Sequence, residues 1–167
     1  MKKILPLILW TISSFLTWSQ NVPDTTQKII SGRTNSQEQQ QKPYVILISA
    51  DGFRYDYAQK YGATNLLQLS NEGVRAESMI SSYPSLTFPN HYTLVTGLYP
   101  SHHGIVNNYF YDRNRHAFYS MRNSKAVKDG SWYGGTPLWV LAEQQHMLTA
   151  SFYWVGSEAD SKGGGPT

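Results

Sequence analysis

The chain has 167 residues, a formal net charge of +3 and no cysteine. The lack of cysteine excludes a disulfide scaffold and a thiolate zinc site, so any metal must be held by oxygen and imidazole ligands. Lys2 and Lys3 supply two of the excess positive charges, which leaves about +1 for the rest of the chain. That balance excludes the dense basic patch of a nucleic-acid-binding protein.

The first 20 residues have the pattern of an export signal. Lys2 and Lys3 precede the apolar run Ile4–Leu16, and small and polar residues follow it up to Gln20. Two serines interrupt the run, which is too short for a stable membrane span. We therefore predict a signal peptide over residues 1–20 and an exported protein, periplasmic or extracellular.

Residues 21–42 are polar and rich in Gln, Ser and Thr, so they predict a flexible leader. Order is expected from residue 43, and residues 43–167 are predicted to form one domain. Its first element, Tyr44–Ala50, is a short apolar run with β-branched residues that ends at Asp51-Gly52. Such a run is typical of a strand buried on both faces in a parallel sheet, and it is too short for a buried helix.

The elements that follow alternate between helical and extended patterns. A helix is expected over Thr64–Asn71, with Thr64 as its cap and Gly73 closing it in the left-handed conformation. The further expected elements, in chain order, are a strand over Val74–Ile80, a helix from Thr87–Pro89 to Gly97, a hairpin over Asn108–Ser120, a helix over Thr136–Met147 capped by Thr136, a strand over Leu148–Trp154 and a glycine loop over Val155–Thr167.

This order of elements predicts an α/β fold with a mainly parallel sheet flanked by helices. In such folds ligands bind at the carboxyl ends of the strands, which is where Asp51 lies. The carboxylate can be a metal ligand there. It can equally be an ordinary turn residue, because Asp-Gly is a common turn pair.

Thr87 lies between Pro84 and Pro89, at the predicted start of a helix. Free N–H groups and the helix dipole favour an anion at this place, such as a phosphate or a threonine alkoxide. A threonine hydroxyl becomes a nucleophile only when a base or a metal activates it. The alternative is a threonine that caps the helix and does nothing else.

Other residue types give weaker signals. The five histidines show no metal-ligand spacing, and we expect His91 to pack within its helix. Most of the many aromatic residues are expected in the core. Phe88, beside Thr87, is the aromatic residue best placed to stack on a nucleobase.

Three blocks of sequence resemble the nucleotide pyrophosphatase/phosphodiesterase family of the alkaline phosphatase superfamily. They are Val45–Arg54, which contains Ser-Ala-Asp-Gly-Phe-Arg, then Tyr83–Pro100, which contains Thr-Phe-Pro-Asn-His, and then His103–Asn108. The resemblance implies an alkaline-phosphatase-like fold and two zinc ions. It implies that Asp51 is a ligand of one zinc ion and that Thr87 is the nucleophile and touches the same ion.

The resemblance also gives roles to two neighbours of Thr87. Asn108 would donate a hydrogen bond to a nonbridging phosphate oxygen, and Phe88 would stack on the base of a small nucleotide diester. The family's domain is far longer, and its other zinc ligands would follow Thr167. We therefore expect a truncated fragment with one partial metal site and no turnover by itself.

Two alternative functions stay open at this point. One is a phosphomonoesterase or a lipid-headgroup phosphodiesterase of the same superfamily. The other is a non-catalytic exported binding fragment, with the aromatic residues between Tyr109 and Trp132 as its partner surface.

Overall fold

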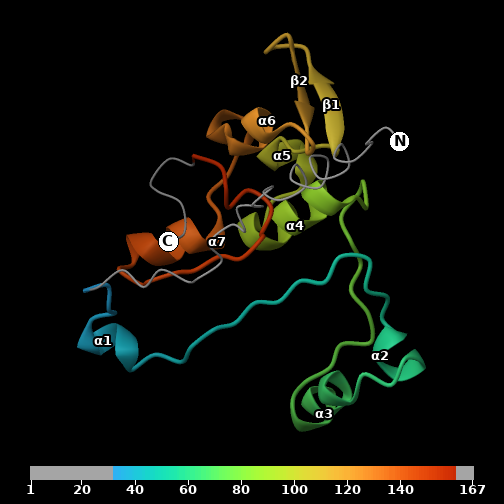
Figure 1. Cartoon of the computed structure of the whole chain (residues 1–167), viewed down its shortest axis with the longest axis vertical. Helices are drawn as coiled ribbons and strands as arrows, with labels where there is room; N and C mark the ends of the chain where they lie inside the picture. The colour runs from blue at the N-terminus through green and yellow to red at the C-terminus, as the bar shows by residue number, and fades with distance from the viewer. Residues whose placement is uncertain (1–31, 161–167) are drawn as a thin grey trace, which may run out of the picture. The chain divides into compact units, whose positions relative to one another are not determined.

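The computed structural model describes residues 32–160, and all of these except Gly32 belong to one unit that begins at Arg33. The predicted signal peptide lies outside the described residues. Figure 1 labels the elements, which are α1 (Gln37–Gln40), α2 (Tyr57–Lys60), α3 (Thr64–Glu72), α4 (Thr87–Thr96), α5 (Pro100–His103), β1 (Tyr109–Asp112), β2 (Ala117–Ser120), α6 (Ser124–Lys128), the 3-10 turn η1 (Gly130–Trp132) and α7 (Leu138–Gln144).

Helix α4 has the bounds that the sequence predicts and packs against α5 and α7. It ends where Gly97 takes φ = 68°, a left-handed conformation that glycine adopts without a steric penalty. Its buried side chains are Pro89, Tyr92 and Val95, three residues apart, so they share one face. This buried face fixes the orientation of the helix that begins at Thr87.

The predicted hairpin is confirmed. Strands β1 and β2 pair antiparallel, with Phe110 opposite Tyr119. Side chains alternate along the strands, so Tyr119 is buried while Phe118 is exposed and stacks on Tyr109 with ring centroids 5.4 Å apart. Strand β2 also contacts α6, which closes one side of the core.

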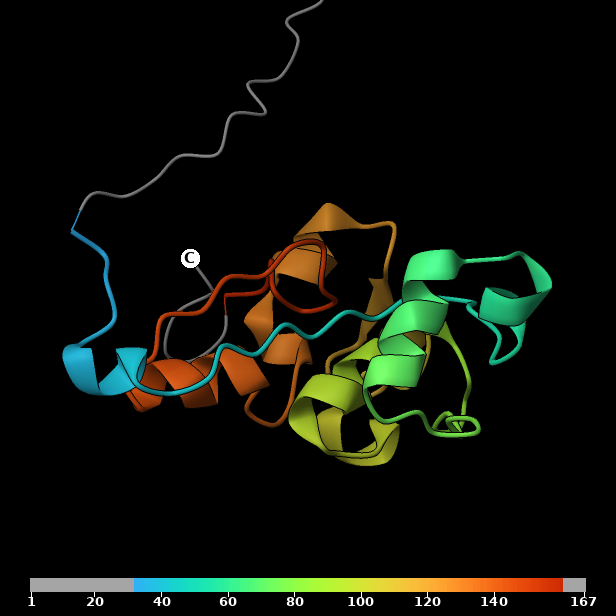
Figure 2. The same cartoon turned by 90° about the horizontal axis from the view of Figure 1, so that it is seen from below.

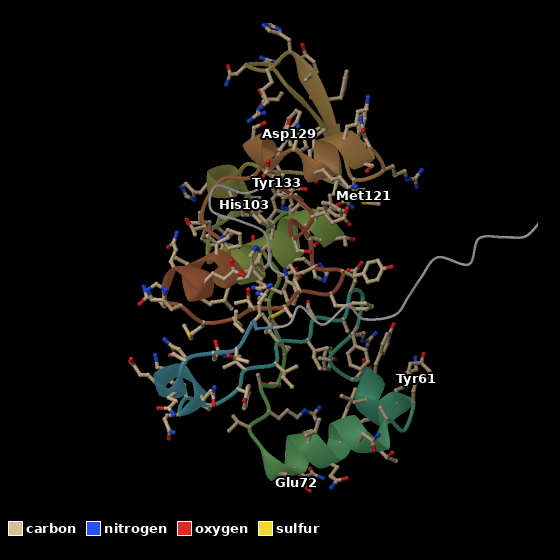
Figure 3. All side chains as sticks on the ribbon, turned by 60° about the vertical axis from the view of Figure 1, so that its left-hand side comes forward. Tyr61, Glu72, His103, Met121, Asp129 and Tyr133 are labelled. Atoms are coloured by element: carbon tan, nitrogen blue, oxygen red, sulfur yellow. The ribbon has the colours of Figure 1, made fainter. Side chains whose placement is uncertain are left out.

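The core is built mainly from aromatic rings. The Tyr92 ring centroid lies 5.1 Å from that of His103 and 5.1 Å from that of Tyr133, both edge-on; Figure 3 labels His103 and Tyr133. The buried members of this cluster are Tyr92, Val95, Ile105, Tyr119, Ala126, Trp132, Trp139 and Val140.

Within residues 32–160 the structure does not show the predicted parallel sheet. Tyr44–Ala50 is drawn as an extended trace without a strand, and its side chains are exposed, with Ile46 at 84% (Figure 1). Val74–Ile80 and Leu148–Trp154 also lack strand structure. The physical reason is that a strand needs a hydrogen-bonded neighbour, and within residues 32–160 β1 and β2 are the two strands that pair.

The ends of two helices, α3 and α7, differ from the prediction. Ala63, not Thr64, precedes α3, and Gly73 ends it with φ = −116° instead of a left-handed conformation. Helix α7 begins at Leu138 with Pro137 as its N-cap, so Thr136 does not cap it. The two starts shift by one or two residues, the usual scatter at helix termini, whereas α7 ends at Gln144 and not at Met147.

Helix α1 lies where the sequence predicted a flexible leader. Ser36 caps it, and the Gln39 side-chain amide donates to the Gln145 carbonyl oxygen at 2.8 Å (Figure 2). The Leu148 N–H donates to Asn35 Oδ1, also at 2.8 Å. These bonds attach residues 35–40 to the turn that follows α7.

His103 is buried within the core, and this burial lowers its pKa. Backbone hydrogen bonds at Pro89 and at His103 itself raise the pKa by a smaller amount, and no charged side chain contributes to the shift. Tyr92 is the titratable group against the ring, and Tyr133 lies on the other side of Tyr92. The folded state therefore favours neutral histidine.

We expect stability to fall as the pH drops below about 6.5, the usual pKa of histidine in an unfolded chain. A group with a lowered folded-state pKa stabilises the fold fully above that pH, because below it the unfolded chain binds more protons. The measurement is the midpoint of urea unfolding between pH 8 and pH 5. His103→Gln should flatten this dependence, whereas His102→Gln, at the exposed neighbouring position, should leave it unchanged. Equal slopes for both variants would contradict the assignment.

Candidate nucleophile and metal-binding site

The structure brings Asp51 and Thr87 into direct contact. Thr87 is the first residue of α4, and its hydroxyl donates to Asp51 Oδ2 at 3.0 Å. Asp51 comes from the turn that follows the extended segment Tyr44–Ala50. The carboxylate and the helix-start hydroxyl, which the resemblance assigns to the same metal ion, therefore form one pair of oxygen atoms.

Asn108 joins this pair from the start of the hairpin. The N-cap of α4 is Leu86, which has no side-chain acceptor, and Asn108 Oδ1 instead accepts the Phe88 N–H at 3.0 Å. Because a backbone N–H can only donate, the atom that faces it must be the carbonyl oxygen of the Asn108 side chain. The two N–H bonds of the same amide are thereby left to donate in another direction.

Phe88 and His91 pack against aromatic residues near the helix start. Phe88 is half-buried, with its ring centroid 6.3 Å from that of Tyr119. His91 Nδ1 lies 2.9 Å from the Thr87 carbonyl oxygen, and its ring meets Trp154 edge-on at 6.0 Å. The expectation that His91 packs within its helix agrees with this arrangement.

Sequence reasoning missed Asn90. Its Nδ2 donates to the carbonyl oxygens of Pro84 at 2.9 Å and Leu86 at 3.0 Å, so it holds the loop that leads into Thr87. The signal in the sequence is an asparagine in the first turn of a helix, where such a side chain competes for backbone groups.

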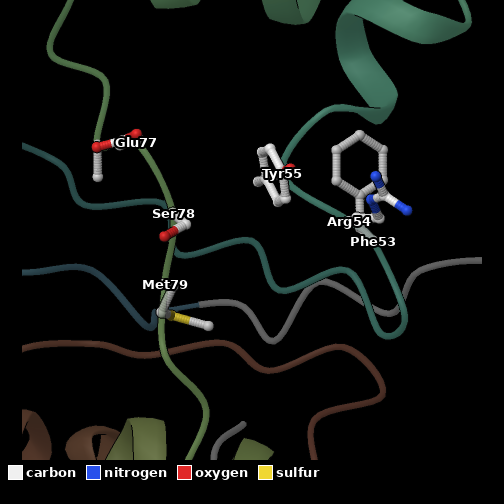
Figure 4. A pocket seen from close by; sticks show the side chains of 7 residues that line it. Phe53, Arg54, Tyr55, Glu77, Ser78 and Met79 are labelled. Atoms are coloured by element: carbon white, nitrogen blue, oxygen red, sulfur yellow. The ribbon is translucent and has the colours of Figure 1, made fainter.

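An open pocket of about 460 Å³ follows Asp51 along the chain (Figure 4). Phe53, Arg54 and Tyr55 line one side of it, and residues 76–79 line the other. Arg54 pairs with Asp56 at 2.8 Å, and this carboxylate raises the pKa of the guanidinium. The positive charge of Arg54 is therefore partly neutralised by its own neighbour.

The fit of a metal ion can be judged from the donors present. Asp51 and Thr87 offer a carboxylate and a hydroxyl oxygen 3.0 Å apart, a pair that can share one cation. Within residues 32–160 no group of three or more His, Cys, Asp or Glu side chains could hold a metal ion. Because structural and catalytic zinc sites use at least three protein ligands, the pair fits as one part of a zinc site and not as a complete one.

In the same described part of the chain, no helix has the length and apolar character needed to cross a membrane.

Comparison with known proteins places this chain in a family. Residues 45–167 match the type I phosphodiesterase/nucleotide pyrophosphatase family. A pyrophosphatase/phosphodiesterase of Schizosaccharomyces pombe is 41% identical over 140 residues, which are 83% of this chain and 29% of that protein. Ectonucleotide pyrophosphatase/phosphodiesterase family member 3 of Mus musculus is 41% identical over 127 residues, which are 75% of this chain and 14% of that protein.

Solved structures agree with the sequence matches. An inactive threonine-to-alanine variant of murine ectonucleotide pyrophosphatase/phosphodiesterase 5, in complex with AMP, matches with a TM-score of 0.67 and 29% identity. The match covers 71% of this chain and 32% of that one. The chain thus spans less than a third of the length of each of these relatives. The family match and the structural likeness together show that the chain belongs to the type I phosphodiesterase/nucleotide pyrophosphatase family.

Proposed function

We propose that this chain carries the nucleophile and part of one metal site of a zinc-dependent phosphodiester and pyrophosphate hydrolase. The observation that supports the proposal is the contact between the Thr87 hydroxyl and Asp51 Oδ2 at 3.0 Å, at the start of a ten-residue helix. The hydroxyl lies at the positive end of the helix dipole, where developing negative charge is stabilised.

In the proposed reaction, Thr87 Oγ1 forms a bond to phosphorus while the bond from phosphorus to the leaving oxygen breaks. Asp51 Oδ2 already accepts the hydrogen bond of the hydroxyl, so it orients the attacking oxygen and can receive its proton. Zinc, when bound, would neutralise charge on the reacting oxygens and lower the pKa of the attacking hydroxyl. Water then releases the phosphoryl group from Thr87 and restores the hydroxyl.

Asn108 and Phe88 would hold the substrate. The Asn108 amide, with its oxygen bound to the Phe88 N–H, keeps its donors for a nonbridging phosphate oxygen. Phe88 would stack on a nucleobase with the ring face that does not meet Tyr119. A structural relative in complex with AMP supports a nucleotide as the substrate.

We further propose that Tyr44–Ala50 forms a strand of a mainly parallel sheet when partner strands are available to it. Its apolar side chains on both faces support this, because they are otherwise exposed to water. The names of the relatives, ectonucleotide and venom phosphodiesterases, support an exported protein.

The function can be tested in a hybrid enzyme. The matching segment of the Schizosaccharomyces pombe relative is replaced by residues 45–167 of this chain, so that the host supplies the rest of the metal site. We expect the hybrid to hydrolyse a nucleotide phosphodiester, to lose activity with a chelator and to regain it with zinc. The unmodified 167-residue chain, with two metal-binding oxygens in its described part, should show no turnover in the same assay.

Three substrates separate the related reactions. Faster hydrolysis of a phosphomonoester or of a lipid-headgroup diester than of the nucleotide diester would contradict the proposed substrate class. A folded hybrid whose hydrolysis does not respond to chelator and zinc would overturn the proposed metal dependence.

A further inference from the structure

A row of polar side chains connects the buried His103 with the loop that precedes Thr87. His103 is fully buried on α5, and its Nε2 lies 3.0 Å from Thr93 Oγ1 on α4 (Figure 3). A buried polar group cannot bond to bulk water, so it needs hydrogen-bond partners within the protein. The partners of His103 determine which of its ring nitrogens carries the proton.

The tautomer of His103 follows from its other ring nitrogen. The Ile105 N–H donates to His103 Nδ1 at 3.2 Å, so Nδ1 carries no proton. The proton of the neutral ring is then on Nε2, which donates to Thr93 Oγ1. The Thr93 hydroxyl accepts this bond and is free to donate its own hydrogen further.

The row continues in one direction toward the loop. Thr93 Oγ1 lies 3.4 Å from Ser82 Oγ, and Ser82 Oγ donates to Asn90 Oδ1 at 3.1 Å. Because Ser82 uses its own hydrogen on Asn90, Thr93 is the donor in the first of these contacts. Each group therefore accepts from the group before it and donates to the next.

Asn90 connects the row to the backbone beside the proposed nucleophile. With its Oδ1 occupied by Ser82, its Nδ2 donates to the carbonyl oxygens of Pro84 and Leu86. Leu86 directly precedes Thr87. We propose that His103 is a positioning residue, which acts through Thr93, Ser82 and Asn90 to fix the backbone from which the Thr87 hydroxyl reaches Asp51.

The catalytic role of this row of side chains rests on the proposed function. The hydrogen bonds of the row can be tested without an activity assay. Each link joins partly buried side chains, so the loss of one hydroxyl removes a hydrogen bond that water does not fully replace. The expected result is local loosening of the loop, and not uniform loosening of the fold.

The test is amide hydrogen exchange, followed by NMR, on the complete 167-residue chain and its Thr93→Val variant. Valine keeps the β-branched shape and removes the hydroxyl. We expect exchange of the Leu86 and Asn90 amides, which bond to the Pro84 and Leu86 carbonyl oxygens, to become about tenfold faster. Amides of α7 and of the hairpin should keep their rates.

Thr96→Val is the matched control. Thr96 lies on the same helix with similar burial, but its hydroxyl donates to the Tyr92 carbonyl oxygen and is not part of the row. It should leave exchange at Leu86 and Asn90 unchanged. Equal acceleration in both variants, or none in Thr93→Val, would overturn the proposal.

Two further measurements keep the proposal open to refutation if Thr93→Val does not fold. Ser82→Ala removes the next link from the loop side and should loosen the same two amides. The ¹⁵N shifts of the wild-type His103 ring must correspond to a protonated Nε2 and an unprotonated Nδ1; the opposite tautomer would exclude the direction of the row. If the hybrid enzyme is inactive but the hydrogen bonds of the row are intact, the proposed function is refuted and the proposed row of hydrogen bonds is not.

Discussion

Replacing Thr87 with alanine in the hybrid enzyme is expected to lower kcat for the nucleotide phosphodiester by at least about a thousandfold. The substitution removes the oxygen that would bond to phosphorus, and within the described residues no other hydroxyl donates to Asp51 Oδ2. The measurement is the steady-state rate with zinc present. Thr87→Ser keeps a hydroxyl and should retain measurable activity.

The control for this prediction is Thr96→Ala, which removes a hydroxyl from the other end of the same helix. It should change kcat less than about tenfold, because its hydroxyl serves the helix end and not the site. A hybrid with Thr87→Ala that keeps its zinc-dependent rate would show that another group attacks phosphorus.

The largest loss of stability is expected at Tyr119. Tyr119→Ala should lower the free energy of unfolding by about 3–5 kcal/mol, the range for large-to-small changes in a core. The side chain is fully buried, stacks on Phe110 at 5.2 Å and meets Trp132 at 5.5 Å. Urea unfolding at neutral pH measures the difference.

Two variants separate the contributions of ring and hydroxyl. Phe118→Ala, on the exposed face of the same strand, should cost less than about 1 kcal/mol. Tyr119→Phe removes only the hydroxyl, which lies 2.8 Å from the Tyr133 hydroxyl, and should cost about 1–2 kcal/mol. An equal cost for Phe118→Ala and Tyr119→Ala would mean that the hairpin presents the other face to the core.

Burial raises the pKa of Tyr119 to about 12, and its hydrogen bond to Tyr133 acts in the opposite direction with a smaller effect. Burial also raises the pKa of Tyr133 beyond the usual range of tyrosine. Both hydroxyls therefore stay protonated at neutral pH, and the pair is a neutral hydrogen bond within the aromatic core.

Elements with local start and stop signals could be predicted from the sequence. Helix α4 ends at Gly97 because a left-handed glycine closes it, and the hairpin turns at the polar residues after Asp112. The predicted strand Tyr44–Ala50 is not formed in the structure, because its pairing depends on partner strands, which a local pattern does not supply.

The site residues also differ in whether the sequence predicts them. Asp51 and Thr87 could be singled out because each lies at the end of an expected element, and the structure places them in contact. The contacts of Asn90 and His103 could not, since their partners, Ser82 and Thr93, carry no sequence signal that they form hydrogen bonds. Side-chain hydrogen bonds of this kind depend on packing that a linear pattern does not contain.

The bond between Asn108 and the Phe88 N–H places two demands on a single side chain. An aspartate would still accept from the N–H, but it would bring a negative charge and no donor to an incoming phosphate. An alanine would leave the helix start without its acceptor, and a glutamine would reach too far by one methylene group. Among the side chains compared, asparagine alone has the length, the acceptor and the donors, so the proposed phosphate contact and the start of α4 depend on the same residue.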